Sequence, residues 1–579
     1  MTEIQRSPNV IVIGAGPSGI SLAHTMKHKM GFDNFLMYEK LEGPGGTWRT
    51  NSYPGCGCDI PTQLYSFHFE LNPDWSKELC DREEILEYME RTVDKYNLRP
   101  HMIFDIYCLG AKWHPDRGQW EVRFRDNKSK LEFSRYATVL VSAVGGISEP
   151  RDVKFEGMEN FRGEMFHTAR WNHDYDYTGK RMAVIGNGCS AAQVVPAVTP
   201  KVSIVKQYAR SPQWYHERPN RPFTSFEKWC CRYVPLWQRY LRLRQFFEND
   251  SLVTTYMPGE AAAKARAITE ANAKNYIFSA TPEKYHDFIV PDFPLGCKRR
   301  IFDPGYLQNL HSPKVELVPE GIRKITETGI VSSSGAQDEF DVIVLATGFK
   351  VQQFLTPMEI IGAHGVSLQR QWDESRGAQA YLGTAVHNFP NFGILFGPNT
   401  FPAHNSALYS CEVQVSYLAR AIIAPIIDRR VRVLDVKEAR QKVWTNSIYK
   451  ELEGSVFSAG CSNWYINEFG NNAASFPGYA SDLWKQTWFT TNGLADFDTI
   501  PDEKVGWFFR MVSRWITTTI RPRKTLSLVT AAVLLMVWQQ KRGKGGNLLA
   551  TSFLGLGSVR EILGSVQDSA SGLVRSLKP

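Results

Sequence analysis

Two glycine-rich turns, each directly after a short apolar run, constrain the fold of this 579-residue chain more than any other feature. The first is G-x-G-x-x-G at residues 14–19 after Val10–Ile13, and the second is G-x-G-x-x-A at residues 186–191 after Arg181–Ile185. Strand, glycine turn and helix in this order place a pyrophosphate at a helix N-terminus. We therefore predict an α/β fold with two Rossmann-type dinucleotide-binding domains.

The first turn predicts an FAD site. Residues 20–29 have helical composition, and a second apolar strand at 34–38 ends in Glu39. This acid lies about 25 residues after the turn begins, near the usual place for gripping an adenosine ribose. Cofactor contacts are expected from the turn glycines and from a second backbone turn downstream, namely Gly14, Gly16, Gly19, Gly46, Thr47 and Trp48.

The second turn predicts an NADPH site. A strand expected at Val202–Val205 is followed by Lys206, Gln207 and Arg210, where an NAD enzyme would carry an acid. Cations in place of that acid suit a ribose 2′-phosphate. Arg210 is the best candidate, and Gly186, Gly188 and Ala191 form the turn.

The cysteines argue against a metal site and against a dithiol mechanism. None of the ten has zinc-ligand spacing or forms a secreted disulfide framework, so we expect reduced thiols. Flavoprotein disulfide reductases carry a redox cysteine pair close after such a Gly-Gly-Thr. Here Trp48 follows, and a disulfide between Cys56 and Cys58, separated by one residue, would be strained.

The net charge of +8 is concentrated toward the C-terminus, where basic residues bracket an apolar stretch at 525–538. That stretch is shorter than the roughly 20 residues needed to span a bilayer. Apolar residues then recur at helical spacing from Leu556 to Leu577. Two alternatives fit this tail: docking on an anionic membrane surface, or a helix packed on the body or on a partner.

The start of the chain gives no targeting signal. Residues 1–9 are polar and run straight into the first strand, which leaves no room for the apolar core of a signal peptide. We therefore expect a cytoplasmic enzyme, with the tail as the part that could contact a membrane. No nucleic-acid module is present in the sequence, and its basic residues suit cofactor phosphates better than DNA.

A short sequence motif between the two turns, here called the phrase, narrows the prediction to one family. Phe161, Gly163, His167 and Trp171 stand in F-x-G-x-x-x-H-x-x-x-W spacing. With the two turns, this phrase resembles the flavin-dependent Baeyer-Villiger monooxygenases, and the match recurs over residues 8–480. Further matching pieces are Tyr53-Pro54-Gly55, Cys58-Asp59, Arg210-Ser211-Pro212-x-Trp214, Cys297-Lys298-Arg299 and Ala346-Thr347-Gly348.

A second group of segments looks similar to the subgroup that acts on aryl ketones and fungal polyketides. These segments are Gly397-Pro398-Asn399 with His404, and Asn463-Trp464-Tyr465 leading to Pro477-Gly478. The resemblance to this subgroup implies a role in secondary metabolism such as polyketide tailoring.

The family resemblance implies bound FAD, NADPH as hydride donor, and O2 as the source of an oxygen inserted next to a ketone carbonyl. It implies that Arg299 is the active-site arginine, that Asp59 is the carboxylate beside it, and that Lys298 joins Arg210 at the NADP 2′-phosphate. The remaining cofactor contacts that it implies are Tyr65, Ser190, Ser211, Ala346, Thr347 and Gly348.

Elementary chemistry agrees with the role of Arg299. A fixed guanidinium stabilises an anionic oxygen nucleophile and the oxyanion formed on the attacked carbonyl. An arginine left alone in a half-buried site would cost several kcal/mol, so a partner acid is expected. The alternative is that Lys298, Arg299 and Arg300 form a solvated basic run.

The phrase itself is expected to take part in gating. Oxygen chemistry requires the exclusion of water, and segments between nucleotide domains are natural places for closure. We expect His167 and Trp171 to sense NADP-bound closure rather than to transfer protons, with a buried core histidine as the alternative. Aromatic residues that could line a substrate pocket, or belong to the core, are Trp214, Trp464, Tyr465 and Phe476.

The motifs described above predict how the chain divides into domains. We predict a first FAD-domain part at 1–150, an NADP domain at 151–338 with a helical insertion at about 216–290, a second FAD-domain part at 339–500, and a tail at 501–579. Aromatic residues recur in the insertion between Trp229 and Phe247 at near-helical spacing. They could cover the substrate entrance, touch membrane lipid or form a packing face.

Two rival functions remain. One is a flavin monooxygenase that oxygenates nitrogen or sulfur instead of a carbonyl neighbour. The other is a non-catalytic NADPH-binding protein tethered to a membrane by its tail. Oligomeric state is not predicted from the sequence.

Overall fold

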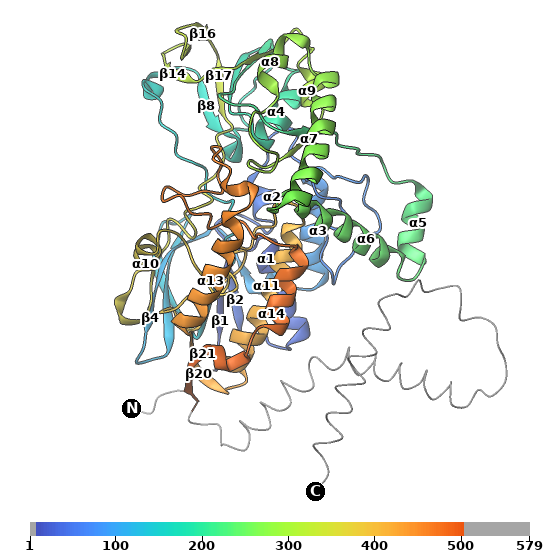
Figure 1. Ribbon diagram of the computed structural model, residues 1–579. Helices are drawn as coiled ribbons and strands as arrows, with labels where there is room; N and C mark the ends of the chain where they lie inside the picture. Colours follow the sequence, from blue (N-terminus) through green and yellow to red (C-terminus); the bar gives the residue numbers. More distant parts are fainter. Residues whose placement is uncertain (1–6, 503–579) are drawn as a thin grey trace, which may run out of the picture. The chain divides into compact units, whose positions relative to one another are not determined.

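The computed structural model describes residues 7–502 (Figure 1). The predicted C-terminal tail, including the apolar stretch at 525–538, lies outside the described residues.

The first glycine turn belongs to a parallel five-stranded sheet. Its strands are β1 Val10–Ile13, β2 Phe35–Tyr38, β3 Met102–Ile103, β7 Val139–Ser142 and β19 Phe392–Ile394, in the order β19-β7-β1-β2-β3. All four residues of β1 are buried, as a central parallel strand requires, and Val12 lies opposite Met37 and Val141. The predicted strand at 10–13 is confirmed.

The second glycine turn belongs to another parallel five-stranded sheet. Its strands are β8 Glu164–His167, β9 Arg181–Ile185, β10 Ile204–Tyr208, β13 Val315–Val318 and β17 Val342–Leu345, in the order β13-β10-β9-β17-β8. The predicted α/β fold with two dinucleotide-binding sheets is confirmed, and so is the strand at 181–185.

Two predicted positions in this sheet are wrong. Strand β10 runs from Ile204 to Tyr208 rather than over 202–205, because polar side chains at its centre find partners there. Strand β17 lies between β9 and β8, so the second sheet continues beyond the predicted boundary at residue 338. Its apolar sequence marks it as buried but does not reveal which of two sheets it joins.

Smaller sheets flank the two large ones. Strands β4 Ile106–His114, β5 Gln119–Asp126, β6 Glu132–Ala137 and β18 Glu359–Ile361 form a sheet in the order β18-β4-β5-β6. The others are β14 Ile322–Ile325 with β15 Gly329–Ser332 and β16 Gln337–Glu339, β20 Val431–Val436 with β21 Phe497–Pro501, and β11 Tyr215–His216 with β12 Ile301–Phe302.

Helices cover the sheets and follow the turns. Outside the insertion they are α1 Pro17–His24, α2 Thr47–Thr50, α3 Arg82–Lys95, α4 Cys189–Val198, α9 Tyr306–Asn309, α10 Leu368–Glu374, α11 Ala407–Leu418, α12 Ala424–Ile427, α13 Glu438–Glu453 and α14 Ala480–Phe489. The continuous helical run Ala407–Ile427 is long and apolar enough to cross a membrane, but 72% of it is buried inside the protein. It packs on α1 and is therefore a core helix.

The segment predicted as a helical insertion contains α5 Ser225–Tyr233, α6 Trp237–Ser251, α7 Glu260–Ala280 and α8 His286–Ile289. Figure 1 shows α5 at the outer end of this group. A capping box fixes the start of α5: the Thr224 hydroxyl accepts from the Glu227 backbone N–H, and the Glu227 carboxylate accepts from the Thr224 backbone N–H.

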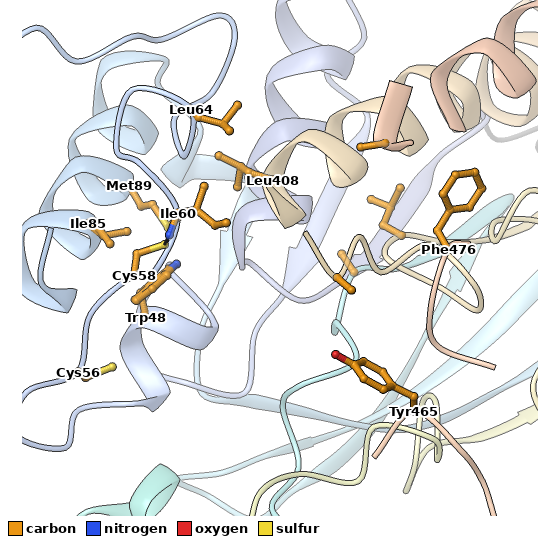
Figure 2. Close-up of a cluster of buried hydrophobic side chains, with 14 of the residues drawn as sticks. Trp48, Cys56, Cys58, Ile60, Leu64, Ile85, Met89, Leu408, Tyr465 and Phe476 are labelled. Carbon is orange, nitrogen blue, oxygen red and sulfur yellow. Dashed lines mark hydrogen bonds between the residues drawn. The ribbon is translucent and has the colours of Figure 1, made fainter. Parts of the chain in front are cut away.

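A large hydrophobic core joins the first sheet to its helices and to the C-terminal part of the described chain. Figure 2 shows Trp48 and Cys58 beside Ile85 and Met89 of α3, with Tyr465 on the opposite side of the view.

The prediction of reduced thiols is wrong for two of the cysteines. Cys297 and Cys461 form a disulfide, with Cα atoms 6.1 Å apart, within the usual range for such a bond. The other eight are free thiols. A separation of 164 residues hides this pairing from sequence inspection.

Candidate active site

A cleft opens at the first glycine turn. It is lined by six of the residues predicted to contact FAD, namely Gly14, Gly16, Glu39, Gly46, Thr47 and Tyr65. Segments 106–108 and 353–358 complete the end near Glu39. The glycine turn and the acid after β2 thus line one cleft, as a dinucleotide site requires.

Two glycines of this region have no room for a side chain. A Cβ on Gly19 would meet the Gly14 carbonyl oxygen at 2.2 Å, and one on Gly46 would meet the Gly16 Cα at 2.8 Å. Gly46 also has a φ of 52°, in the left-handed region. These close approaches bring the two predicted backbone turns against each other at the cleft.

Glu39 directly follows β2 and accepts hydrogen bonds from the first glycine turn and from the segment after β2. One carboxylate oxygen accepts from the Ala15 backbone N–H at 2.7 Å, and the other accepts from Leu41 at 3.0 Å. Burial raises the pKa of Glu39, and the backbone donors act against that rise. The acid is therefore held at the lip of the cleft, where a ribose hydroxyl would meet it.

Gly19 and Trp48 support the cleft from behind and do not line it. Trp48 is buried, and its indole N–H donates to the Tyr65 hydroxyl at 3.2 Å. Tyr65 itself reaches the cleft wall.

The second turn closes onto the end of β17. A Cβ on Gly186 would meet the Ala346 carbonyl oxygen at 2.4 Å, whereas Gly188 faces open space. Ser190 and Ala191 lie in the first turn of α4, where Ala191 is fully buried. Backbone N–H groups at this helix start are available to an anion, so the arrangement fits a dinucleotide phosphate.

Cations gather beside this helix start. The Lys298 ammonium donates to the Ser211 hydroxyl at 2.7 Å and lies 4.7 Å from the centre of the Phe293 ring. Burial lowers the pKa of Lys298, and the positive charge of Arg210 lowers it further. Two cations held this close favour an anion between them, which fits a 2′-phosphate.

Lys206 does not belong to this cluster, although the sequence places it with Arg210. It lies within β10, and its ammonium is 2.7 Å from Asp338 and 2.9 Å from Glu316. Gln207 is fully buried and donates to the Gly186 carbonyl oxygen. Both side chains therefore serve the sheet.

The basic run at 298–300 is not solvated as a unit. Arg300 is buried and donates to the Tyr256 and Thr255 hydroxyls. Arg299 donates to the Asp59 carboxylate, with Nη2 and Oδ2 2.6 Å apart, and both side chains are 24% exposed. Burial by itself would lower the pKa of Arg299, but the Asp59 carboxylate raises it, and the net pKa is raised. Arg299 is therefore a permanent cation at a half-buried site.

Comparison with known proteins assigns the chain to a family. A family model of flavin-binding monooxygenase-like proteins matches residues 7–222. The chain is 34% identical over 480 residues to a Baeyer-Villiger monooxygenase of Pseudomonas aeruginosa, covering 82% of this chain and 88% of that relative. The chain belongs to the Baeyer-Villiger monooxygenase family.

Two further relatives support the assignment. The FAD-binding monooxygenase ktnD of Aspergillus niger is 34% identical over 480 residues, covering 81% of this chain and 78% of ktnD. The crystal structure of cyclohexanone monooxygenase from Rhodococcus sp. Phi1 bound to NADP+ matches with a TM-score of 0.75 at 26% identity, covering 86% of this chain and all of that one. This Baeyer-Villiger monooxygenase is thus an FAD-dependent, NADPH-consuming enzyme.

An aromatic wall of the monooxygenase faces Arg299. The Phe401 ring centre lies 5.7 Å from the guanidinium, and Trp464 packs edge-on against Phe401 at 5.2 Å. Tyr465 is fully buried beside Trp464. Sequence reasoning missed Phe401, although it lies between the Gly397-Pro398-Asn399 run and His404, two segments that carried the subgroup resemblance.

Trp214 and Phe476, two other aromatic candidates, are buried core residues. The Trp214 indole N–H donates to the Phe293 carbonyl oxygen at 2.9 Å.

The fingerprint phrase of the family forms the edge of the second sheet rather than a free linker. His167 ends β8, its Nδ1 accepts from the Ala169 backbone N–H, and burial lowers its pKa to about 4. Trp171 is buried against Phe166 and Tyr177. His167 is therefore uncharged at neutral pH and does not act as an imidazolium acid.

The two ends of the phrase hold it against β17 and the turn that follows. A Cβ on Gly163 would meet the Asp341 carbonyl oxygen at 2.4 Å, and Phe161 packs into the small core of the second sheet. The ring centres of His167 and Phe349 are 5.8 Å apart, and the Gly348 backbone acts to raise the pKa of His167. The phrase therefore touches the segment Ala346–Gly348, which leads from the second sheet back toward the first.

Proposed function

We propose that this monooxygenase inserts one oxygen atom next to the carbonyl of an apolar, aromatic-bearing ketone, giving an ester or a lactone. One observation carries the proposal: the Arg299 cation, held by Asp59, lies over the Phe401 ring, which packs edge-on against Trp464. Positive charge and apolar aromatic rings at one place suit a substrate with a polar carbonyl on an apolar frame.

In this proposal Arg299 provides electrostatic stabilisation. Its guanidinium holds negative charge on the attacking oxygen and on the carbonyl oxygen as it becomes an oxyanion. Asp59 orients the guanidinium by a charge-assisted hydrogen bond and lowers the free-energy cost of its partial burial. FAD, when bound, supplies the activation of O2.

The cofactor sites follow the geometry. The cleft at the first turn would hold FAD, with Glu39 at the ribose. The start of α4 would hold the NADP pyrophosphate, and Lys298, Arg210 and Ser211 would hold the 2′-phosphate. His167 and Trp171 would couple the second sheet to the turn at 346–348 when NADP binds.

The biological setting belongs to the same proposal. Two relatives named as FAD-binding monooxygenases, ktnD and tazF, come from Aspergillus species, and they support a role in secondary metabolism such as polyketide tailoring. The basic, apolar tail supports contact with a membrane surface.

The test is oxygen incorporation. Purified enzyme with NADPH, labelled ¹⁸O2 and a panel of aryl and cyclic ketones is expected to give esters or lactones that carry one labelled oxygen. Arg299→Ala should keep its FAD and its reduction by NADPH but lose at least about 10²-fold in product formation, because a positioned cation is removed from the transition state. Mass spectrometry of products and a peroxide assay measure both effects.

The proposal fails if sulfide or amine substrates are oxygenated while no ketone of the panel gains labelled oxygen. It also fails if Arg299→Ala converts ketones at the rate of the unchanged enzyme.

A further inference from the structure

Helices α5 and α6 expose an unusual number of large apolar side chains. They form one surface, here called the aromatic face, whose members are 37% to 74% exposed: Phe226, Trp229, Tyr233, Leu236, Trp237, Tyr240, Leu243 and Phe247. Scattered apolar residues on a surface are ordinary, but a contiguous group marks an interaction site.

The spacing shows that these residues share a direction. In α6 and the residue before it, Leu236, Tyr240, Leu243 and Phe247 follow the i, i+4, i+7, i+11 pattern of a single helical stripe. In α5, Phe226, Trp229 and Tyr233 do the same, and their rings contact one another in sequence. Each helix thus presents one aromatic stripe.

The inner side of α6 packs through Phe246, which contacts Tyr409, and is otherwise held by polar contacts. Gln238 is buried and donates to the Gln63 side chain at 2.8 Å and to the Asn72 carbonyl oxygen at 2.6 Å. Arg242 donates to the Leu64 carbonyl oxygen at 2.7 Å and lies 3.3 Å from the Glu412 carboxylate. A surface helix of a soluble protein normally buries its apolar stripe; α6 exposes its stripe and is held in that orientation by polar contacts.

The connection between the helices also points outward. Leu236 has a φ of 63°, in the left-handed region, and is 74% exposed. That region is a conformational outlier for a bulky residue such as leucine. The chain therefore accepts local strain at a position where a large apolar side chain faces outward.

Charge decides which partner suits the face. Residues 225–247 contain five basic side chains and one acidic side chain. Arg242 faces the body of the protein, and Arg232 and Arg244 pair with Asp74 and Glu248, so Lys228 and Arg239 are the cations available beside the aromatic face. Residues 503–579 are also basic, with twelve basic and three acidic residues. A second copy of the face or this tail would bring like charges together, whereas an anionic lipid surface complements both.

We propose that the aromatic face docks on an anionic phospholipid membrane. Tryptophan and tyrosine rings prefer the headgroup level, where one end is apolar and the other is hydrated. Arginine and lysine beside them reach lipid phosphates while their stems cover apolar surface. This surface is independent of the oxygenation chemistry and of the tail, and it would bring α6, which contacts residues 63–66, close to an apolar ketone dissolved in lipid.

The experiment uses the full chain and two kinds of vesicle, phosphatidylcholine alone and phosphatidylcholine with phosphatidylserine. The face variant carries Trp229→Ser, Leu236→Ser and Trp237→Ser. The matched control is Phe489→Ser, which removes a 74% exposed aromatic ring on α14. A tail variant with Val533→Ser, Leu534→Ser and Leu535→Ser separates the contribution of the C-terminal segment.

Flotation should show binding of the unchanged protein to the anionic vesicles, with the face variant reduced at least tenfold and Phe489→Ser unchanged. Hydrogen exchange should show protection of residues 225–247 on vesicle addition, also in the tail variant. FAD content and oxidation of a water-soluble ketone should be the same in all variants, which shows that each is folded.

Other results would overturn the proposal. Vesicles that leave exchange at 225–247 unchanged would exclude docking of this face. Protection that is present without vesicles and disappears in the tail variant would assign the face to the tail. Sedimentation showing a dimer that the face variant dissociates would assign it to a second copy.

Discussion

Lys298 and Lys206 are the same residue type, but their surroundings give them different expected roles. Both are lysines close to the end of the second nucleotide motif, but Lys206 is neutralised by Glu316 and Asp338, whereas Lys298 has a hydroxyl and another cation nearby. A phosphate would therefore bind favourably beside Lys298 but not beside Lys206. Affinity for the 2′-phosphate should therefore depend on Lys298 and not on Lys206.

Lys298→Ala is expected to raise KM for NADPH roughly 10- to 100-fold, because a hydrogen bond to a charged group contributes about 1.5–3 kcal/mol. KM for NADH should change by less than about twofold, since NADH lacks the phosphate. Steady-state kinetics with both cofactors measure the difference, and Lys206→Ala is the matched control. An equal rise for NADPH and NADH would contradict the assignment.

His167 makes a residue-scale prediction about pH. Its pKa falls from 6.5 to about 4 because the ring is buried. The unfolded chain therefore binds a proton between these values that the folded protein does not. Stability from this residue is complete above pH 6.5 and is lost as pH falls toward 4, by about 2 kcal/mol at pH 5.

His167→Asn should remove that loss, because asparagine can still accept from the Ala169 N–H but does not titrate. Urea unfolding at pH 8 and pH 5 compares the two proteins. The free energy of unfolding of the variant should fall less between pH 8 and pH 5 than that of the unchanged protein. The rate of NADPH oxidation should depend on pH in the same way in both proteins between pH 6 and 8. Parallel acid losses in both proteins would show that His167 is not responsible.

At the scale of elements, the disulfide joins two segments of the candidate active site. Cys297 precedes Lys298 and Arg299, and Cys461 lies in the loop that carries Trp464 and Tyr465. The bond thus ties the segment of Arg299 to the aromatic wall across a closed loop of 164 residues. Its loss should loosen that loop relative to Arg299.

Cys461→Ser is expected to lower the free energy of unfolding by about 2–4 kcal/mol, the usual effect of opening a long disulfide loop. Thermal melting with and without a reductant measures this. Reductant should lower the melting temperature of the unchanged protein and leave Cys461→Ser unaffected; Cys230→Ser, at a free thiol, should behave like the unchanged protein. An unchanged protein that melts identically under both conditions would contradict the expectation.

Some elements were accessible from sequence and others were not. Strands β1 and β9 are predictable because an apolar run ends directly at glycine. The extent of β10 is not, because Lys206 owes its place in the strand to acids more than a hundred residues away. The pairing of Arg299 with Asp59 spans 240 residues and follows only from the family resemblance.

The outward orientation of α6 was equally hidden. Aromatic residues at helical spacing ordinarily indicate a buried stripe, and only the contacts of Gln238 and Arg242 show which side faces the body.

For the molecule as a whole, the contact between the two dinucleotide-binding parts is a tight one. The loop that carries Asp59 packs on α4 of the second sheet, where the Tyr53 hydroxyl donates to Gln193 and the Gln193 amide donates to the Gly57 carbonyl oxygen. Gly55 has a φ of 80°, and a Cβ there would meet the Gln193 carbonyl oxygen at 2.5 Å. The loop of Asp59 can therefore pack this closely on α4 only while position 55 lacks a side chain.

Gly55→Ala should push α4 away from the loop and displace Asp59, and with it Arg299, from the start of α4. We expect FAD content to remain unchanged, because Gly55 does not line the first cleft. The share of NADPH electrons released as hydrogen peroxide should rise severalfold, since a misplacement of about 1 Å can cost 10²-fold in a positioned step. Gly179→Ala is the control: its φ of 70° carries the same backbone penalty, but its Cβ meets nothing within 4 Å. Peroxide yield per NADPH should separate the two variants, whereas equal yields would show that backbone strain, and not the contact between the two parts, governs coupling.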